Sequence, residues 1–483
     1  MRIFLLLFLI CPMMLVSSAR AEVAEPAPRA DDQFDVMNWL TDQGLHNIKE
    51  EAWNAYGQFT YIVSAKSAFS APYTNLNGST NSLLPSAERS YTGSATLYLG
   101  ARLWHGAEAY VVPELIAEEA LSDLKGLGGV IQNFELQKSG AKDPRVYLSR
   151  AYVRQIFGFG GKPVHFESDP MQLGGTVDSR RLVITAGNFS ILDFFDKNTF
   201  SGDLRKQFNN MAFLTYAAYD FAADARGYTI GLVAEYYHDD WAVRAGHILP
   251  PADPNQLPLS FKPFTFFGDQ VELEHKHTLF DQPGVVRVLG YRNRENMGRF
   301  DDALNAYQAN NNLNATNCLS FNYGSNNSTA PDLCWVRKPN LKMGIGINME
   351  QQLSDDIGVF FRGMYSDGNT EVYSYTSTDR SISLGALMKG SRWGRGRDSV
   401  GIGYAQGWLS RSHIAYLNAG GIDGFIGDGK INYAPEMAID LFYSFNVFTS
   451  LWFTADYQHI ENPAFNADRG PVDIYSVKGH FEF

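Results

Sequence analysis

The sequence predicts an all-β protein: a closed antiparallel transmembrane β-barrel of about 16 strands, with 18 as the next choice, preceded by a short N-terminal helix. Three observations predict this class. Long runs of residues alternate between apolar and polar side chains. The chain begins with a signal for export, and it ends in an alternating aromatic segment whose last residue is Phe483.

The composition narrows the classes of protein that remain. The chain has 483 residues and a net charge of -12; 14% of its residues are aromatic and 44 are glycine. The negative charge argues against nucleic acid as a partner, because binding to phosphates needs a basic surface. After residue 21 no stretch approaches about 18 consecutive apolar residues, so we expect no transmembrane helix. A soluble β-protein and an outer-membrane β-barrel are the classes left.

The first 21 residues have the three parts of a secretory signal peptide. Arg2 supplies a positive charge, residues 3–16 are apolar, and Ala19-Arg20-Ala21 is a cleavage site of the A-x-A type. We therefore expect residues 1–21 to be removed, residues 22–52 to form a leader with a short helix, and residues 53–483 to form the barrel. The helix is expected within residues 34–51, which carry a loose apolar stripe at helical spacing.

From Trp53 onward the sequence changes to a period of two. These runs are longer than the usual strand of about 5 or 6 residues and reach the roughly 9 to 11 residues that a tilted membrane strand needs. Candidate strands lie at 53–65, 90–104, 106–116, 145–157, 181–190, 212–222, 226–237, 240–248, 269–280, 284–294, 341–352, 357–367, 379–390, 397–407, 434–446, 449–460 and 471–483. A bacterial single-chain barrel closes with an even number of strands. One of these 17 segments is therefore wrong or one strand is missing, and 16 is the preferred number.

The end of the chain and the spacing of the runs favour the membrane class over a soluble sandwich. Tyr475, Val477, Gly479, Phe481 and Phe483 stand at every second position. This pattern is typical of the last strand of an outer-membrane barrel, which the barrel assembly machinery reads. Gaps between runs alternate between short and long, as periplasmic turns and extracellular loops do. We therefore expect the outer membrane of a Gram-negative bacterium, with lipid and lipopolysaccharide around the barrel.

Several segments, in the same order along the chain, resemble the carbohydrate-selective outer-membrane porin family (OprB-type). They are Leu97–Tyr110 with Pro113-Glu114, Arg150–Gln155, Gly187–Asn198 with Gln207–Asn210, Tyr219–Tyr228, and Asn462-Pro463 with Gln458. The resemblance runs from about residue 54 to residue 483. The chain departs from the family pattern at Tyr56-Gly57-Gln58 and over residues 117–143.

This resemblance implies a 16-stranded barrel that passes mono- or small oligosaccharides across the outer membrane by facilitated diffusion. It implies no enzyme activity and no cofactor, and porins of this kind are often homotrimers. Two alternatives stay open: a general or charged-solute channel, and, less favoured, a secreted glycan hydrolase with two carboxylates. None of the chain's acidic residues lies in a recognisable catalytic pattern.

The candidate site is a narrow part of the pore formed by inward-facing residues of the strands at 90–116 and 145–157. In a barrel the polar face of each strand faces the lumen. Arginines and carboxylates hydrogen-bond to sugar hydroxyls, and an aromatic ring stacks on a sugar face. The predicted contacts are Arg102, Trp104, Glu108, Glu114, Arg150 and Arg154. The alternative is a network of ion pairs that merely solvates these charges.

Four further sets of polar residues and cysteines have predicted roles outside the candidate site. Asp193, Asp196 and Asn198 are expected in a capped turn that folds into the lumen, and Asp220, Asp224 and Arg226 in a turn tied by ion pairing. His275 and His277 lie on one side of a strand but lack a third metal ligand, so we expect no metal there. Cys318 and Cys334, in an exported chain, are expected to form a disulfide in the longest extracellular loop.

Overall fold

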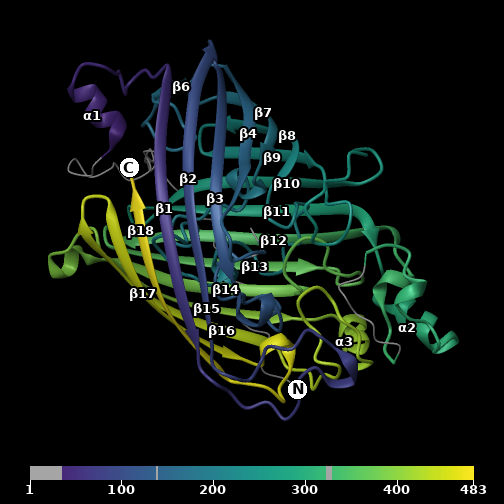
Figure 1. The fold of residues 1–483 in the computed structure, drawn as a ribbon. Helices are drawn as coiled ribbons and strands as arrows, with labels where there is room; N and C mark the ends of the chain where they lie inside the picture. Colours follow the sequence, from purple (N-terminus) through teal and green to yellow (C-terminus); the bar gives the residue numbers. More distant parts are fainter. Residues whose placement is uncertain (1–34, 137–139, 322–328) are drawn as a thin grey trace.

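The computed structural model describes residues 35–136, 140–321 and 329–483, and within them a single closed barrel. The predicted signal peptide and residues 22–34 of the leader lie outside the described residues. The barrel strands are β1 (Trp53–Lys66), β2 (Glu88–Trp104), β3 (Ala107–Glu119), β4 (Arg145–Gly158), β7 (Arg181–Phe189), β8 (Thr229–His238), β9 (Trp241–Ile248), β10 (Phe267–Leu279), β11 (Gln282–Met297), β12 (Lys338–Ser354), β13 (Ile357–Ser366), β14 (Arg380–Lys389), β15 (Ser399–Trp408), β16 (Glu436–Phe448), β17 (Leu451–Glu461) and β18 (Val472–Glu482). Each strand pairs antiparallel with the next, which confirms the predicted 16-stranded barrel (Figure 1).

The first and last strands close the barrel, as the sequence predicted. β1 pairs antiparallel with β18, so that Phe59 lies opposite Phe481. Phe483 continues this ladder: its backbone N–H and C=O each form a 2.9 Å hydrogen bond with Gly57. A Cβ atom on Gly57 would lie 2.5 Å from the Phe483 ring, so a larger residue here would force the ring to move from its place over the strand. Closure leaves the barrel itself, within the described residues, without an unpaired strand edge.

One of the 17 predicted strands is wrong. Residues 212–222 form no strand; this segment begins within a 3-10 turn, η4 (Met211–Phe213), and runs through the interior of the barrel. Nearly all of its side chains are buried, on both sides of the backbone. The segment is rich in apolar residues because it is surrounded by protein, and a short apolar run of this kind has the appearance of a strand. Without this segment, the 17 predicted strands become the 16 strands of the barrel.

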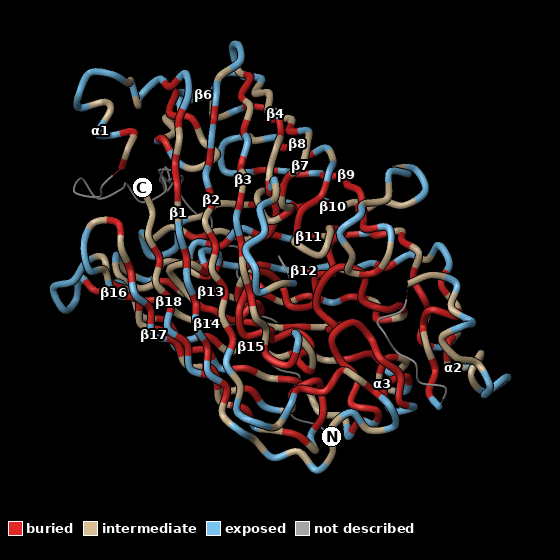
Figure 2. The backbone as a smooth tube through the Cα atoms, in the orientation of Figure 1, coloured by how far each residue is buried: buried red, intermediate tan, exposed pale blue. Residues whose placement is uncertain are grey.

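Apolar side chains face outward along the barrel, whereas polar side chains face inward. In β2 the inward Thr92, Ser94 and Thr96 are buried, and the outward Leu97 and Leu99 are exposed. This is the reverse of a soluble sandwich, in which the apolar face packs against a core. Figure 2 shows buried chain segments running through the interior and more exposed residues along the outer wall.

The two ends of the barrel differ in the length of their connections. Five turns of two residues, at 105–106, 239–240, 280–281, 355–356 and 449–450, lie at one end, the short-turn end. The longest connections, at 190–228 and 298–337, lie at the other end, the long-loop end. Short periplasmic turns and long extracellular loops are the pattern of outer-membrane barrels. The short-turn end is therefore the periplasmic end.

The helices lie at the ends of the barrel. They are α1 (Val36–Asp42), α2 (Phe300–Ala309) and α3 (Arg411–Asn418), and β5 (Pro163–Phe166) and β6 (Gly175–Asp178) form a separate hairpin at the short-turn end. α1 is shorter than the predicted 34–51 and buries Met37 against Tyr56 and Tyr98. Every helix in the described part of the chain is too short or too polar to cross a membrane.

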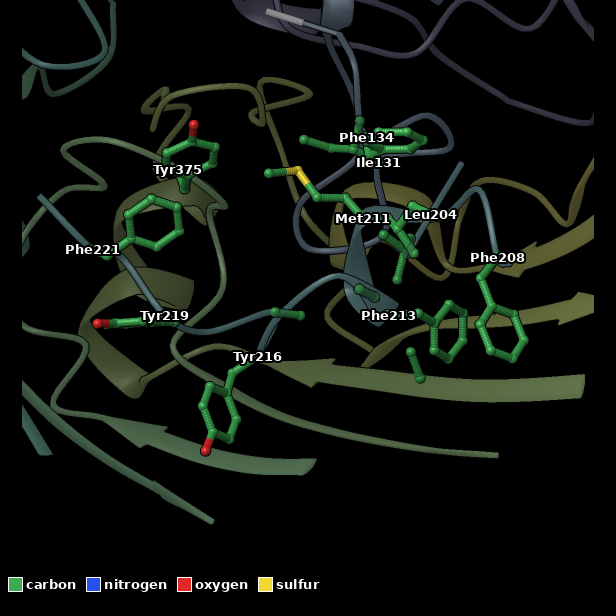
Figure 3. Packing of buried hydrophobic residues seen from close by; sticks show 14 of the residues in the cluster. Ile131, Phe134, Leu204, Phe208, Met211, Phe213, Tyr216, Tyr219, Phe221 and Tyr375 are labelled. Atoms are coloured by element: carbon green, nitrogen blue, oxygen red, sulfur yellow. The ribbon is translucent and has the colours of Figure 1, made fainter. Parts of the chain in front are cut away.

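The connection between β7 and β8, residues 190–228, folds back into the barrel; we call it the inner loop. It begins with the 3-10 turn η3 (Ile191–Asp193) and carries the largest apolar cluster of the interior. Phe208 and Phe213 pack with ring centroids 4.7 Å apart, and Phe221 stacks on Tyr375 at 4.4 Å (Figure 3). The inner loop therefore fills part of the lumen and narrows the remaining space.

Candidate functional site

The space left beside the inner loop forms a cavity of about 920 Å³. At one end its lining includes Tyr228, which directly precedes β8 at the long-loop end. At the other end it includes Asp355 and Asp356 of the turn between β12 and β13, at the short-turn end. The cavity therefore extends along the barrel past the inner loop, and we call it the channel.

Arg150 is a lining residue of the channel, and it is held by the inner loop. Its Nε and Nη2 atoms each donate a 2.7 Å hydrogen bond to the Asp193 carboxylate. Asp193 also accepts a hydrogen bond from the backbone N–H of Ser190, which caps the 3-10 turn. The guanidinium lies 5.3 Å from the centre of the Tyr228 ring. This bidentate pair fixes both the wall and the inner loop.

Arg154 is also a lining residue of the channel, four residues further along β4 toward the short-turn end. It lies between two tyrosines, with its guanidinium 5.3 Å from the Tyr110 ring and 5.6 Å from the Tyr152 ring. Its nearest carboxylate oxygen belongs to Glu108, at 3.8 Å. The guanidinium is therefore held mainly by aromatic faces and is only weakly neutralised.

The structure brings Arg102, Glu108 and Arg154 together in one row across β2, β3 and β4. Glu108 lies opposite Arg102 and opposite Arg154 in the strand register. Arg102 lies 3.7 Å from Glu108, but its strongest contact is a 2.9 Å hydrogen bond from Nε to the Glu51 carbonyl. Arg102 thus ties the segment before β1 to the barrel at the short-turn end, and neither it nor Glu108 belongs to the channel lining.

Glu114 faces inward as expected but lies behind the channel wall. It is 2% exposed and accepts hydrogen bonds from Thr96 Oγ1 at 2.9 Å and from the Tyr147 hydroxyl. The Tyr228 hydroxyl, on the inner loop, donates to it at 3.4 Å. Glu114 therefore positions tyrosines around Arg150 rather than meeting a solute itself.

Trp104 does not face the lumen, in contrast to the expectation from strand parity. A β-bulge between Arg102 and Trp104 shifts the register, so Trp104 pairs with Ala107 and turns to the outer face. There it is 61% exposed and donates a 2.9 Å hydrogen bond to Gln155. Exposed aromatics also mark the short-turn ends of neighbouring strands, among them Trp53 and Trp241. Trp104 fits the aromatic girdle at the membrane interface.

Parity along β10 and β11 would have found charged lining residues that the sequence analysis left out. Lys276 of β10 and Arg287 of β11 line the channel, and Lys197 of the inner loop does as well. Glu272, Glu274 and Lys276 alternate with outward residues, which is the signal of an inward face. Lys197 has no such signal, because it lies in a loop.

The two turns predicted at residues 193–198 and 220–226 make different contacts. Asp196 and Asn198 fold into the lumen with Asp193, as predicted, where Asp196 meets Arg362 of β13 at 3.1 Å. Asp224 caps a turn by accepting from the backbone N–H groups of Arg226 and Tyr228. Asp220 instead forms an ion pair with Lys342 of β12 at 2.9 Å, so its predicted role in the same turn is wrong.

The histidines of β10 have neighbours that are not metal ligands. His275 stacks on Trp241, with ring centroids 4.1 Å apart, and His277 lies 3.1 Å from the side-chain oxygen of Gln351.

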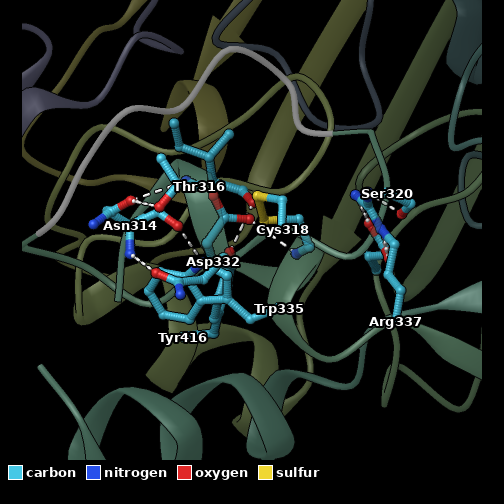
Figure 4. The surroundings of a disulfide bond; sticks show 12 residues. Asn314, Thr316, Cys318, Ser320, Asp332, Trp335, Arg337 and Tyr416 are labelled. Atoms are coloured by element: carbon cyan, nitrogen blue, oxygen red, sulfur yellow. Dashed lines mark hydrogen bonds and ion pairs between the residues drawn. A yellow bond between two sulfur atoms is a disulfide. The ribbon is translucent and has the colours of Figure 1, made fainter. Parts of the chain in front are cut away.

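Cys318 and Cys334 form a disulfide, as expected, in the connection at 298–337 (Figure 4). Asp332 lies beside the sulfurs and accepts a 2.9 Å hydrogen bond from the Cys334 N–H. The three side chains have the chemistry of metal ligands, but both sulfurs are used by the disulfide. Trp335 Nε1 donates to the Asn314 carbonyl at 3.0 Å, so the bridge closes a compact loop.

Comparison with known proteins agrees with this architecture. The sequence profile described as "Carbohydrate-selective porin, OprB family" matches residues 80–483. The high-pH structure of Pseudomonas putida OprB is 14% identical, with a TM-score of 0.63, and the match covers 92% of this chain and 96% of that one. Its low-pH structure gives 12% identity, a TM-score of 0.47 and coverage of 92% and 95%. The outer membrane channel DcaP of Acinetobacter baumannii is 8% identical, with a TM-score of 0.47, and the match covers 89% of this chain and 97% of that one.

No curated protein matches the chain. The profile match nevertheless spans most of the sequence, and it covers every barrel strand except β1. The fold around the channel is similar to that of the Pseudomonas putida protein. The chain therefore belongs to the carbohydrate-selective porin family, OprB, and is a carbohydrate channel of the Gram-negative outer membrane.

Proposed function

We propose that mono- or small oligosaccharides enter the periplasm by facilitated diffusion through the channel beside the inner loop, and that Arg150 and Arg154 are the residues that meet the sugar. The observation that carries this proposal is the continuous cavity of about 920 Å³ that passes both arginines. Guanidinium groups donate several hydrogen bonds in a fixed geometry, and sugar hydroxyls accept them.

The other residues of the predicted site take indirect roles in this proposal. Glu108 and Glu114 are positioning residues, because each contacts the groups that surround the two arginines. Arg102 holds the segment before β1 at the periplasmic mouth. Trp104 is left out of the site because it faces the membrane interface.

Passage requires that the sugar bind weakly. Hydrogen bonds to a sugar replace hydrogen bonds to water, so each adds only about 0.5–1.5 kcal/mol net. Conduction needs a solute that enters readily and also leaves. Arg150 already donates two hydrogen bonds to Asp193, so it has few donors left for a solute and its contact with a sugar stays weak.

Swelling of liposomes that contain the purified protein tests this function. Neutral sugars should enter faster than amino acids of similar size, and Arg154→Ala should raise the single-channel conductance and reduce that difference. Arg180→Ala is the matched control, because Arg180 forms an exposed ion pair with Asp239 at an outer turn. Entry that follows size alone, in parent and variant, would instead indicate a general pore.

We also propose three partners outside the channel. The aromatic residues at the short-turn end, including Trp104, contact lipid head groups of the outer membrane, and lipopolysaccharide surrounds the opposite end. The terminal strand with Phe483 is the segment that the barrel assembly machinery binds. A homotrimer is the proposed assembly; cross-linking of the protein in native membranes, followed by electrophoresis, tests it.

A further inference from the structure

Most arginines along the channel are neutralised by a neighbour. Arg287 lies 2.7 Å from Glu274 and 3.4 Å from Glu350. Arg244, deeper in the wall, contacts Glu235 at 3.2 Å and Glu272 at 2.9 Å. These carboxylates are already bound to arginines and are not free to neutralise a further cation. Three other lining carboxylates have no ion pair within 4.0 Å in the part of the chain that the structure describes: Asp203, Asp240 and Asp355.

Three lysines that line the channel, Lys197, Lys276 and Lys389, have no ion pair within 4.0 Å among the described residues. Of these, Lys197 and Lys276 bear on selectivity, because Lys389 is the last residue of β14, at the short-turn end. In the described part of the chain, the side-chain ammonium groups of Lys197 and Lys276 have no hydrogen bond and no ion pair within 4.0 Å. Lys276 continues the inward face of β10 toward the short-turn end. Lys197 lies on the inner loop, where the channel passes it. The two cations therefore lie along the same path.

The backbone around Lys197 is fixed although its side chain is exposed to the channel. Asp196 on one side is buried and accepts from Arg362 Nε at 3.1 Å. Asn198 on the other side is buried and donates to Asn348 Oδ1 at 2.8 Å. The Lys197 carbonyl accepts a 3.0 Å hydrogen bond from Asn348 Nδ2. The ammonium is thus presented from a rigid support.

The electrostatic surroundings of Lys197 favour the binding of a negatively charged solute. The position of Lys197 inside the barrel, away from bulk water, lowers the pKa of its ammonium, the direction expected of a cation that lacks a counter-ion. Glu235 and Asp193 act in the opposite direction, but each is already bound to an arginine. A bound anion would supply the missing negative charge.

Arg154 is a second cation along the same channel whose charge is only partly neutralised by its neighbours. Its charge is among those that act on Lys197. Among the described residues, its buried Nε atom has no hydrogen-bond partner, and the one carboxylate within 4.0 Å, that of Glu108, is shared with Arg102 at 3.7 Å. Glu108 also accepts from the Tyr110 hydroxyl at 2.8 Å. A carboxylate or phosphate would therefore find donors at Arg154 as well as at Lys197.

From this pattern we infer that the channel selects sugars that carry a negative charge, with Lys197 and Arg154 as the binding position and Lys276 as the next position toward the periplasm. This inference rests on the proposed function, because it names the class of carbohydrate that passes. Neutral sugars would use the same hydroxyl contacts without the charge. Since two weakly neutralised positions follow each other, an anion that leaves one reaches the next, and neither retains it.

The test compares galactose with galacturonate, which differ by one carboxylate, in liposomes and in planar bilayers. We expect galacturonate to permeate faster than galactose through the parent channel at about 0.1 M salt. Lys197→Gln should lower the ratio of the two rates by about two- to fivefold, the range that one partly screened charge pair gives. Lys197→Arg should keep the ratio near that of the parent.

The matched control is Lys338→Gln, which removes the same charge outside the channel lining, where Lys338 pairs with Asp302. It should leave the ratio unchanged. Heat-modifiable mobility in detergent gels confirms that each variant is folded. Raising the salt to about 1 M should reduce the parent's preference, because the screening length falls from about 10 to about 3 Å.

The outcomes separate the two levels of the proposal. If galactose passes but galacturonate has no advantage, or if Lys197→Gln keeps the parent's ratio, the charge selectivity is overturned and the sugar channel stands. If neither sugar passes while small ions do, the sugar channel itself fails. A third arm with galactose 6-phosphate identifies the anion: a ratio to galactose above that of galacturonate points to phosphorylated sugars, and a lower one to sugar acids.

Discussion

We predict that the hydrogen bonds of Arg362 hold the inner loop against the barrel wall. It comes from β13, is 1% exposed, and donates to Asp196 at 3.1 Å, to Ser201 Oγ at 3.1 Å and to the Phe213 carbonyl at 3.0 Å. Arg362→Ala removes these three hydrogen bonds and a fourth, from Nη2 to the Asp196 carbonyl at 3.2 Å, and leaves the Asp196 carboxylate buried without its cation. Breaking a buried ion pair in this way costs about 3–5 kcal/mol.

The substitution should destabilise the inner loop rather than the barrel. The backbone pairing of β13 with β12 and β14 does not depend on the Arg362 side chain. We therefore expect a folded barrel whose inner loop leaves its place for part of the time. In planar bilayers the variant should show a larger mean conductance, more current noise and less block by sugar than the parent.

A matched variant is Arg292→Ala. Arg292 forms an exposed ion pair with Asp269 at 2.6 Å on the outer side of β11, a kind of pair that contributes only about 0–1 kcal/mol. It should leave conductance and noise as in the parent. If Arg362→Ala gives the parent's conductance, noise and sugar block, the inner loop does not set the width of the channel, and the reasoning is refuted.

Three further predictions follow from single contacts. Deletion of Phe483, or Gly57→Val beneath its ring, should reduce the amount of heat-modifiable barrel in the outer membrane, and normal amounts would contradict the closing role of that residue. Replacing Cys318 and Cys334 by serine should lower the stability of their loop by about 3 kcal/mol in the chain-entropy model; faster proteolysis of the loop at unchanged conductance is the expected reading. Trp104→Ala should leave sugar block as in the parent and weaken membrane insertion, whereas a loss of sugar block would place the ring in the channel after all.

The barrel could be predicted from the sequence because its strands obey one local rule. Each wall residue faces either lipid or the lumen, so polarity alternates with the pleat and can be read without any knowledge of neighbouring strands. The same rule placed Arg150 and Arg154 on the inner face correctly. It failed at Trp104, because a bulge adds one residue to a strand and reverses the side on which the next side chain points.

The inner loop could not be predicted by that rule. Residues 212–222 are enclosed by protein on all sides, so their side chains do not alternate between two environments, and their apolar character predicts a strand that does not form. Lys197 lies between Asp196 and Asn198, in a segment that looks like any polar turn. Its place beside Arg154 depends on pairings with β12 and β13 that lie about 150 residues further along the chain.

The charges inside the barrel have two uses that compete for the same residues. A lumen wall must be polar, and here most of its cations are directed at the inner loop: Lys342 reaches Asp220 at 2.9 Å, and Lys478 donates to the Gln207 carbonyl at 2.8 Å and to Asn209 at 2.9 Å. A cation used in this way is withdrawn from the solute, because its hydrogen bonds are already made. Selectivity then depends on the few cations that the structure leaves unsatisfied. For that reason a change at Lys197 should alter which sugar passes, whereas a change at Lys478 or Arg362 should alter how wide and how steady the channel is.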